Sequence, residues 1–290
     1  MKPAVFSYGK PDTLEEALSL MAEHGHDASV LAGGQSLVPV LSMRIARPAH
    51  VVDLNAVPGL SGIEAEPEAL VVGAMTRQRA ALESELLRDE CPLLAEALAH
   101  VGHPETRNRG TVGGSIAHSD PAAEIGAVAV ACDAEIVLRS STGTRAEPVS
   151  DFLLAPYMTA RRPDELIVET RFPRTRGAWG WAFQEIARRH HDFALVAVAV
   201  GIQLVDGAIG QARIAYAGAG GTALRAHGAE DLLRGATPSA EAFSEAARHA
   251  STEIDPPTDI LASADYRRHV ATVLTQRSLA LAAERAEGER

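Results

Sequence analysis

The spacing of apolar residues in the first part of the chain alternates between helical and strand-like patterns. In residues 12–25, leucine and methionine recur on one helical face, Thr13 and Glu16 fit a capping box, and Gly25 stands where helices commonly end. Short apolar runs without this period predict buried strands. We therefore expect strands at 28–32, 50–55, 69–76, 134–140 and 165–173, and helices at 36–45 and 91–102.

The pattern changes near residues 172–178. Beyond this point, three apolar runs joined by short turns predict a small antiparallel sheet, with strands at 181–187, 193–205 and 212–218. The run 193–205 is shorter than the roughly 20 residues of a membrane span, so we interpret it as a buried strand. A helical period dominates afterwards, at 229–235, 240–250 and 264–286.

These elements predict an α+β fold with two domains. The change in pattern places the first domain at 1–175 and the second at 176–290. Within the first domain, the second set of strands suggests subdomains at about 1–57 and 58–175.

Two glycine pairs, far apart in the sequence, share a chemical setting. We call residues 31–38 (LAGGQSLV) the first glycine segment and residues 109–115 (RGTVGGS) the second glycine segment. Adjacent glycines let the backbone turn sharply, so that consecutive N–H groups point into one concavity that can hold a phosphate. One such pair is commonly an ordinary turn. Two of them predict that the segments face each other and clamp the pyrophosphate of a dinucleotide with main-chain amides.

Two further stretches carry helix or nucleotide signatures. Residues 119–124 (SDPAAE) predict a helix start, with Asp120 as the cap and Pro121 at the first helical position. Residues 218–223 (GAGGTA) match the G-x-G-x-x-A fingerprint, but no strand is predicted after them to complete a βαβ unit. We interpret the second stretch as a glycine turn into the helical tail.

Composition narrows the possible partners. The 290 residues carry a net charge of −11, with lysine only at Lys2 and Lys10, which argues against a nucleic-acid partner. An anionic ligand would be held by amides and arginine. Cys91 and Cys132 are too few for an iron–sulfur cluster, and we expect both to be buried in a reducing cytoplasm. Because no signal peptide or membrane span is predicted, we expect a cytoplasmic protein.

No constellation of side chains predicts catalysis or metal binding by the chain itself. Most histidines match no closed ligand motif, but His118 adjoins the second glycine segment and is a candidate to approach a cofactor. Arg107 and Arg109 either stabilise that segment through carbonyl contacts, which we favour, or face a phosphate. With no catalytic or metal-ligating residue predicted, redox chemistry would belong to a cofactor.

The stretches 29–44 and 103–124, which contain the glycine segments, together resemble the FAD-binding medium subunit of the molybdenum hydroxylases. This family includes carbon monoxide, xanthine and N-heterocycle dehydrogenases. The resemblance continues through DELIVETRFP (164–173) and residues 181–200 to residues 263–279, so it covers nearly the whole chain. It implies a two-part FAD-binding domain of the PCMH type, followed by a C-terminal domain with a small antiparallel sheet and a helical bundle.

The resemblance also implies which residues bind FAD. Those of the first glycine segment would wrap the pyrophosphate, those of the second would face it, and the others would line the cleft or the flavin. The implied residues are Leu31, Ala32, Gly33, Gly34, Gln35, Ser36, Leu37, Val38, Val101, Thr111, Gly113, Gly114, Ser115, Glu124, Ile167 and Phe193. One departure is clear, because Gln184 and Glu185 occupy a segment in which some relatives carry a flavin-stabilising lysine.

The function implied by the resemblance is electron transfer within a heterotrimer. A large subunit with a molybdenum cofactor would hydroxylate the substrate, and a small subunit with two 2Fe-2S clusters would pass the electrons to FAD on this chain. An external acceptor would receive them, and the complex is expected to be a dimer of heterotrimers. Two alternatives remain open: a self-contained flavin oxidoreductase, and a non-enzymatic nucleotide-binding module.

Overall fold

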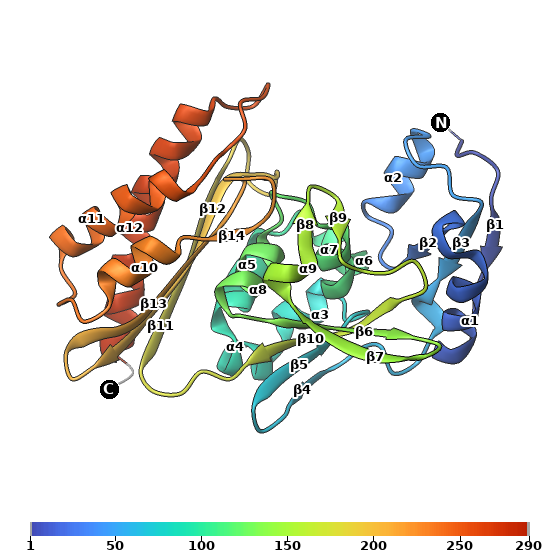
Figure 1. The fold of residues 1–290 in the computed structure, drawn as a ribbon, viewed down its shortest axis with the longest axis horizontal. Helices are drawn as coiled ribbons and strands as arrows, with labels where there is room; N and C mark the ends of the chain where they lie inside the picture. The colour runs from blue at the N-terminus through green and yellow to red at the C-terminus, as the bar shows by residue number, and fades with distance from the viewer. Residues whose placement is uncertain (1, 289–290) are drawn as a thin grey trace.

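A computed structural model describes residues 2–288 and shows three layered parts in chain order (Figure 1). The N-terminal part is a three-stranded parallel sheet with two helices. Its strands, in sheet order, are β1 (Ser7–Gly9), β3 (His50–Asp53) and β2 (Ala28–Leu31), and its helices are α1 (Leu14–His24) and α2 (Leu37–Ser42). Thr13 is confirmed as the N-cap of α1, since its hydroxyl accepts from the Glu16 amide at 3.2 Å, and Gly25 ends the helix with φ 50°. The reciprocal bond of a capping box is displaced by one residue, because the Glu16 carboxylate accepts from the Asp12 amide at 2.9 Å.

The middle part is built on a five-stranded antiparallel sheet. Its strands, in sheet order, are β4 (Ile63–Ala65), β5 (Ala69–Gly73), β10 (Leu166–Pro173), β6 (Glu135–Ser140) and β7 (Gly143–Pro148). A small hairpin, β8 (Leu153–Ala155) and β9 (Met158–Thr159), follows β7. The helices are α3 (Gln78–Glu83), α4 (Glu85–Glu90), α5 (Pro92–His100), α6 (Pro104–Arg109), α7 (Val112–His118), α8 (Glu124–Ala131) and α9 (Val149–Phe152).

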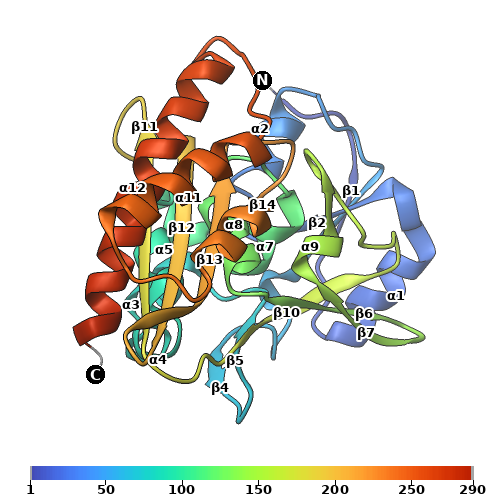
Figure 2. The same cartoon turned by 60° about the vertical axis from the view of Figure 1, so that its left-hand side comes forward.

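The C-terminal part is a four-stranded antiparallel sheet covered on one face by helices, as Figure 2 shows. The strands, in sheet order, are β11 (Trp179–Ala187), β12 (Ala194–Val205), β13 (Ala208–Ala217) and β14 (Leu224–Arg225). The helices are α10 (His227–Leu233), α11 (Ala240–Glu253) and α12 (Ala264–Gly288). The three-stranded meander predicted from the sequence is confirmed, and β14 is a fourth strand that was not predicted.

Both faces of this sheet are buried, which explains the long apolar run in β12. Ala197 and Ala199 belong to the core shared with α5 and α8, whereas Val196, Val198 and Val200 belong to the core beneath α10, α11 and α12. Strands buried on both faces lose the apolar–polar alternation of a half-exposed strand. Among residues 2–288, no helix combines the length and apolar character needed to cross a bilayer.

The predicted helix start in residues 119–124 is wrong in its cap. The helix there, α8, begins at Glu124, and its N-cap is Ala123 rather than Asp120. The Asp120 carboxylate instead accepts a hydrogen bond from the Ala122 amide at 2.9 Å, which closes a turn through Pro121. An Asx turn competes with a helix cap for the same side chain and carries a similar sequence signature.

Residues 218–223 form a turn, as predicted, but the turn leads into β14 before α10 begins. This connection between antiparallel strands contains no βαβ unit, which confirms the prediction that residues 218–223 are a glycine turn and not a dinucleotide fingerprint. The connection between β10 and β11 covers residues 174–178, close to the predicted change of domain. The domain limits themselves, 1–175 and 176–290, stay a prediction.

Candidate functional site

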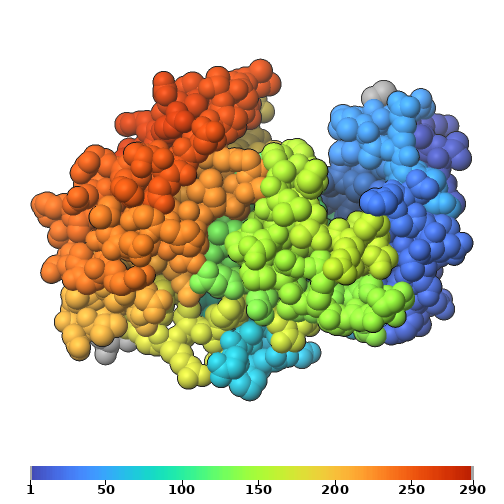
Figure 3. Space-filling view, viewed as in Figure 1, coloured from blue at the N-terminus to red at the C-terminus, as the bar shows by residue number. Residues whose placement is uncertain are grey.

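The two glycine segments touch each other at the junction of the N-terminal and middle parts. A Cβ placed on Gly33 would overlap the carbonyl oxygen of Arg109 and lie 2.8 Å from the Cα of Gly110. A Cβ on Gly114 would lie 3.6 Å from that of Ala32. Figure 3 shows a hollow between α2 and the β8–β9 hairpin on this side of the molecule. The segments therefore meet, as the sequence predicted.

The first glycine segment offers a row of free main-chain donors. Among the contacts of residues 2–288, no protein acceptor is found for the amides of Gly33, Gly34, Gln35 and Ser36. Gly34 has φ 75°, a conformation that only glycine adopts readily, and it directs the chain into α2. Consecutive amides left without acceptors in a half-buried turn form an anion-binding concavity.

The second glycine segment differs from the expected amide-rich loop. Its glycines lie in the first turn of α7, and the Thr111 hydroxyl caps that helix by accepting from the Gly114 amide at 3.1 Å. The Val112 and Gly113 amides donate to the carbonyls of Thr76 and Ala74 at 3.0 Å. The prediction that both segments supply free amides is therefore wrong for the second one, because its amides hold it against the loop after β5.

A polar bridge that was not predicted ties the segments together. The Arg77 guanidinium donates to the Arg109 carbonyl and, at 2.6 Å, to the Asn55 side-chain oxygen. The Asn55 side-chain amide in turn donates to the Ala32 carbonyl at 2.9 Å. Asn55 follows β3 and Arg77 follows β5, so only the tertiary fold brings them together.

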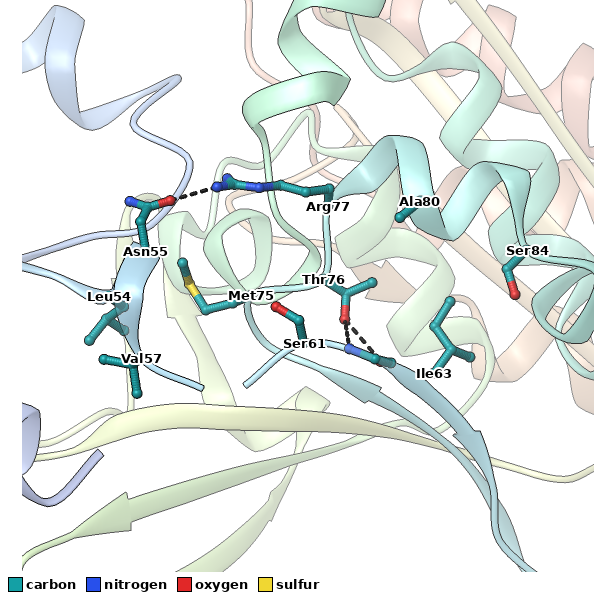
Figure 4. Close-up of a pocket in the computed structure, with 11 residues that line it drawn as sticks. Leu54, Asn55, Val57, Ser61, Ile63, Met75, Thr76, Arg77, Ala80 and Ser84 are labelled. Carbon is teal, nitrogen blue, oxygen red and sulfur yellow. Dashed lines mark hydrogen bonds between the residues drawn. The ribbon is translucent and has the colours of Figure 1, made fainter. Parts of the chain in front are cut away.

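The same two residues line the cavity drawn in Figure 4. Its volume is about 540 Å³, and its wall is formed largely by Leu54, Val57, Ile63 and Met75. Ser61, Thr76 and Ser84 add hydroxyl groups to this wall. No residue of either glycine segment lines it. The Asn55–Arg77 bridge therefore stands between the glycine segments and this cavity.

We expect Arg77→Met to loosen the junction, because it removes both hydrogen bonds of the bridge while keeping the length of the side chain. Two lost hydrogen bonds, one of them to a carbonyl left behind, cost about 1–3 kcal/mol. Dinucleotide affinity should fall by roughly tenfold. Equilibrium dialysis against FAD measures this change. Arg79→Met is the matched control, because Arg79 lies on α3 with its side chain 59% exposed; equal losses in both variants would contradict the prediction.

Arg107 contacts main-chain carbonyls, as we favoured, but those of the turn before α6 and not those of the second glycine segment. Its guanidinium donates to the carbonyls of Val101 and Gly102 at 2.9 and 2.6 Å, and so fixes the turn between α5 and α6. Arg109 is exposed, and its main-chain carbonyl receives the bridge from Arg77. The His118 Nε2 lies 3.9 Å from the Asp120 Oδ2. The His118 ring packs against the Tyr157 ring, with 5.1 Å between the ring centroids.

The remaining implied cofactor residues differ in exposure. Val101, at the end of α5, is buried, as is Ile167 in β10. Beside Ile167 the pairing of β10 with β6 is irregular, and the carbonyl of Val168 accepts from the Ala74 amide at 2.9 Å. Phe193 is 65% exposed just before β12, so its ring is available to cover a ligand.

An acidic cluster lies between the middle and C-terminal parts. Glu124, at the start of α8, is only 6% exposed, and burial raises the pKa of its carboxyl to about 7. Glu185 in β11 lies 3.3 Å from the Nδ1 of His100 at the end of α5, and this contact raises the pKa of His100. The sequence predicted Glu124 as a cofactor residue but did not predict that it shares its surroundings with His100 and Glu185.

Known proteins match the chain over almost its full length. Residues 4–175 match the model of the FAD binding domain in molybdopterin dehydrogenase, and residues 181–282 match that of the CO dehydrogenase flavoprotein C-terminal domain. The chain is 41% identical over 287 residues to the 6-hydroxypseudooxynicotine dehydrogenase complex subunit alpha of Paenarthrobacter nicotinovorans, covering 99% of this chain and 97% of that one.

Two comparisons involve carbon monoxide dehydrogenase of Hydrogenophaga pseudoflava. Its medium chain is 37% identical, with 96% of this chain and 97% of that one covered. The solved structure of this enzyme, in a form that lacks the Mo-pyranopterin moiety of the molybdenum cofactor, superimposes with a TM-score of 0.95 and 38% identity. That superposition covers 98% of this chain and 99% of the other.

Proposed function

Because this chain belongs to the FAD-binding medium subunits of the molybdenum hydroxylases, we propose that it is the electron-transfer flavoprotein of a molybdenum-dependent dehydrogenase. Family membership makes it an oxidoreductase subunit. The observation that carries the proposal is the row of four free amides in the first glycine segment, held against the second segment at the edge of a hollow.

The residues at this junction fit FAD. Free amides of Gly33, Gly34, Gln35 and Ser36 would hold the pyrophosphate, which suits a chain with lysine only at Lys2 and Lys10. The Ser115 side chain has no acceptor or donor among residues 2–288 and would face the same group. Bound FAD would supply the redox chemistry, by accepting electrons and releasing them to an external acceptor.

The other implied residues would place the rest of the cofactor. Leu31, Ala32, Leu37 and Val38 flank the free amides, and Thr111, Gly113 and Gly114 hold the second segment in position. We propose that Val101 and Ile167 form apolar walls, that Glu124 contacts the cofactor, and that Phe193 covers the flavin. The exposure of Phe193 is compatible with this last role.

We propose further that the chain works in a cytoplasmic complex with two partner subunits. One would carry the molybdenum cofactor and the other two 2Fe-2S clusters, arranged as a dimer of heterotrimers. The relatives are named as a medium chain and as a subunit of a dehydrogenase complex, which supports a multi-subunit assembly. Within residues 2–288 the only two cysteines are free and buried, so this chain offers no cluster ligands of its own.

The FAD proposal is tested on the purified chain. We expect it to bind close to one FAD, with the absorption spectrum of a flavoprotein, and to show no substrate turnover alone. A preparation that stays colourless after incubation with FAD would contradict the cofactor assignment. Turnover of an organic substrate without partners would favour the self-contained oxidoreductase instead.

The assembly is tested separately. Affinity purification from the native source should recover a large molybdenum-containing chain and a small chain with iron and acid-labile sulfide. Light scattering should then give the mass of two heterotrimers. Recovery of this chain alone would contradict the electron-transfer proposal, even if FAD is bound.

A further inference from the structure

Three titratable side chains lie on three elements, α5, α8 and β11, of which α5 packs against both of the others. His100 ends α5 next to Val101, Glu124 begins α8, and Glu185 lies in β11. The His100 Nδ1 and a Glu185 carboxylate oxygen are 3.3 Å apart, and the Glu185 side chain is 6% exposed. The second oxygen of Glu185 is buried and has no hydrogen-bond partner in the part of the chain that the structure describes.

The surroundings supply little positive charge. Among residues 2–288, no lysine or arginine forms an ion pair with Glu124 or Glu185. Asp120 faces Glu124 from the loop before α8, and its charge adds to the repulsion. Glu96 of α5 also faces His100. Its carboxylate already accepts hydrogen bonds from the Phe183 amide at 2.9 Å and from the Arg285 guanidinium at 2.7 Å.

The remaining contacts of His100 add no fixed cation. The Phe183 ring packs against it with a centroid distance of 5.3 Å. His191 approaches its main chain, and burial together with neighbouring positive charge lowers the pKa of His191, which favours the neutral ring. Within residues 2–288, His100 is therefore the only basic side chain found to interact with these two buried carboxylates.

This charge count sets the protonation of the cluster. Two carboxylates and one imidazolium carry a net charge of −1, which is costly in a site of low dielectric constant. One additional proton makes the cluster neutral. Burial is the main cause that raises the pKa of Glu124 to about 7, and the charge of Glu185 acts in the same direction.

We propose that His100, Glu124 and Glu185 form an electrostatically coupled cluster in which Glu124 takes up one proton when FAD enters the cleft. The proposal rests on the proposed function, because it assumes that FAD binds beside Glu124. The physical reason is desolvation: a ligand that covers the remaining exposed surface of Glu124 removes water from its carboxylate and favours the neutral acid. The cluster therefore links FAD affinity to pH.

The direction of the pH dependence follows from linkage. If the pKa of the cluster is about 7 in the free protein and higher in the FAD complex, the affinity is highest and constant below pH 7. It falls as pH rises above this value, by at most tenfold per pH unit, and levels off above the pKa of the complex. A rise of one unit in pKa gives a loss of roughly eightfold between pH 6 and pH 9.

Calorimetric titration of FAD into the FAD-free full chain tests whether FAD binding is accompanied by proton uptake. At pH 7.5, phosphate and Tris buffers differ in ionisation enthalpy, and the difference in binding heat gives the number of protons taken up. We expect about half a proton per FAD. Glu124→Gln should abolish the uptake, and Glu185→Gln should move the fall in affinity to lower pH. Glu83→Gln, with its side chain 62% exposed on α3, is the control and should leave the uptake unchanged.

The possible results separate the two proposals. FAD binding without proton uptake, or uptake that persists in Glu124→Gln, overturns the cluster and leaves the FAD assignment intact. Absence of FAD binding overturns the proposed function. If FAD does not bind, infrared spectroscopy of the FAD-free chain still tests the cluster, because a protonated Glu124 carboxyl gives its own band. This band should titrate near pH 7 and disappear in Glu124→Gln, and its absence overturns the cluster independently.

Discussion

Gly33→Ala is expected to remove most of the bound FAD while leaving the chain folded. The added methyl group would overlap the Arg109 carbonyl oxygen and lie 2.8 Å from the Gly110 Cα. Both neighbours are main chain, so neither can rotate away, and the two glycine segments must separate. Strain of about 1–3 kcal/mol is typical when a well-packed site receives an additional methyl group.

This strain acts directly on the amides that we assign to the pyrophosphate. It corresponds to a loss of roughly 10- to 100-fold in FAD affinity. The flavin content of the purified variant and equilibrium dialysis against FAD measure the effect. Gly143→Ala is the matched control, because no atom lies within 4 Å of its added methyl group. Full FAD content in Gly33→Ala would show that contact between the segments is not needed for binding.

Gly180→Ala, in contrast to Gly33→Ala, should lower the stability of the fold strongly and FAD binding less. Gly180 lies in β11 beneath α12, where a methyl group would overlap the Ala282 carbonyl oxygen and the Ala286 amide nitrogen. Ala282 and Ala286 are themselves fully buried. The helix must therefore move away from a sheet that forms the core of the C-terminal part.

A displacement of this helix costs about 1–3 kcal/mol or more, which lowers Tm by roughly 2–10 °C for a chain of this size. Thermal unfolding followed by circular dichroism gives the shift, and flavin content at low temperature is measured alongside. Gly143→Ala again serves as the control. A Tm within about 1 °C of the parent, the size of shift that a surface substitution causes, would contradict the close packing of β11 on α12.

Several features could be predicted because they depend on residues near one another in the chain. Thr13, Glu16 and Gly25 mark the ends of α1 through local hydrogen bonds. The apolar runs around β12 predict strands without reference to any other part of the molecule. The two Gly-Gly pairs identify the family even though they are far apart, since each is a local pattern.

Other features have no local signal. The sequence of residues 119–124 suits both a helix cap and an Asx turn, and only the packing of the surrounding chain selected the turn at Asp120. The main-chain amides of the second glycine segment were expected to be free, but those of Val112 and Gly113 donate hydrogen bonds to the carbonyls of Thr76 and Ala74. Whether an amide is free depends on which acceptors the fold brings to it.

The sequence by itself determined the α+β class, the C-terminal antiparallel sheet, the meeting of the two glycine segments and membership in an FAD-binding family. Only the tertiary structure decided which segment keeps its amides available, that Asn55 and Arg77 join the segments, that His100 contacts Glu185, and that Glu124 is buried. The physical reason is the separation in sequence of the residues that interact. Backbone turns and helix ends are set by neighbouring residues, whereas hydrogen-bond partners and the desolvation of charges depend on surfaces contributed by distant parts of the chain.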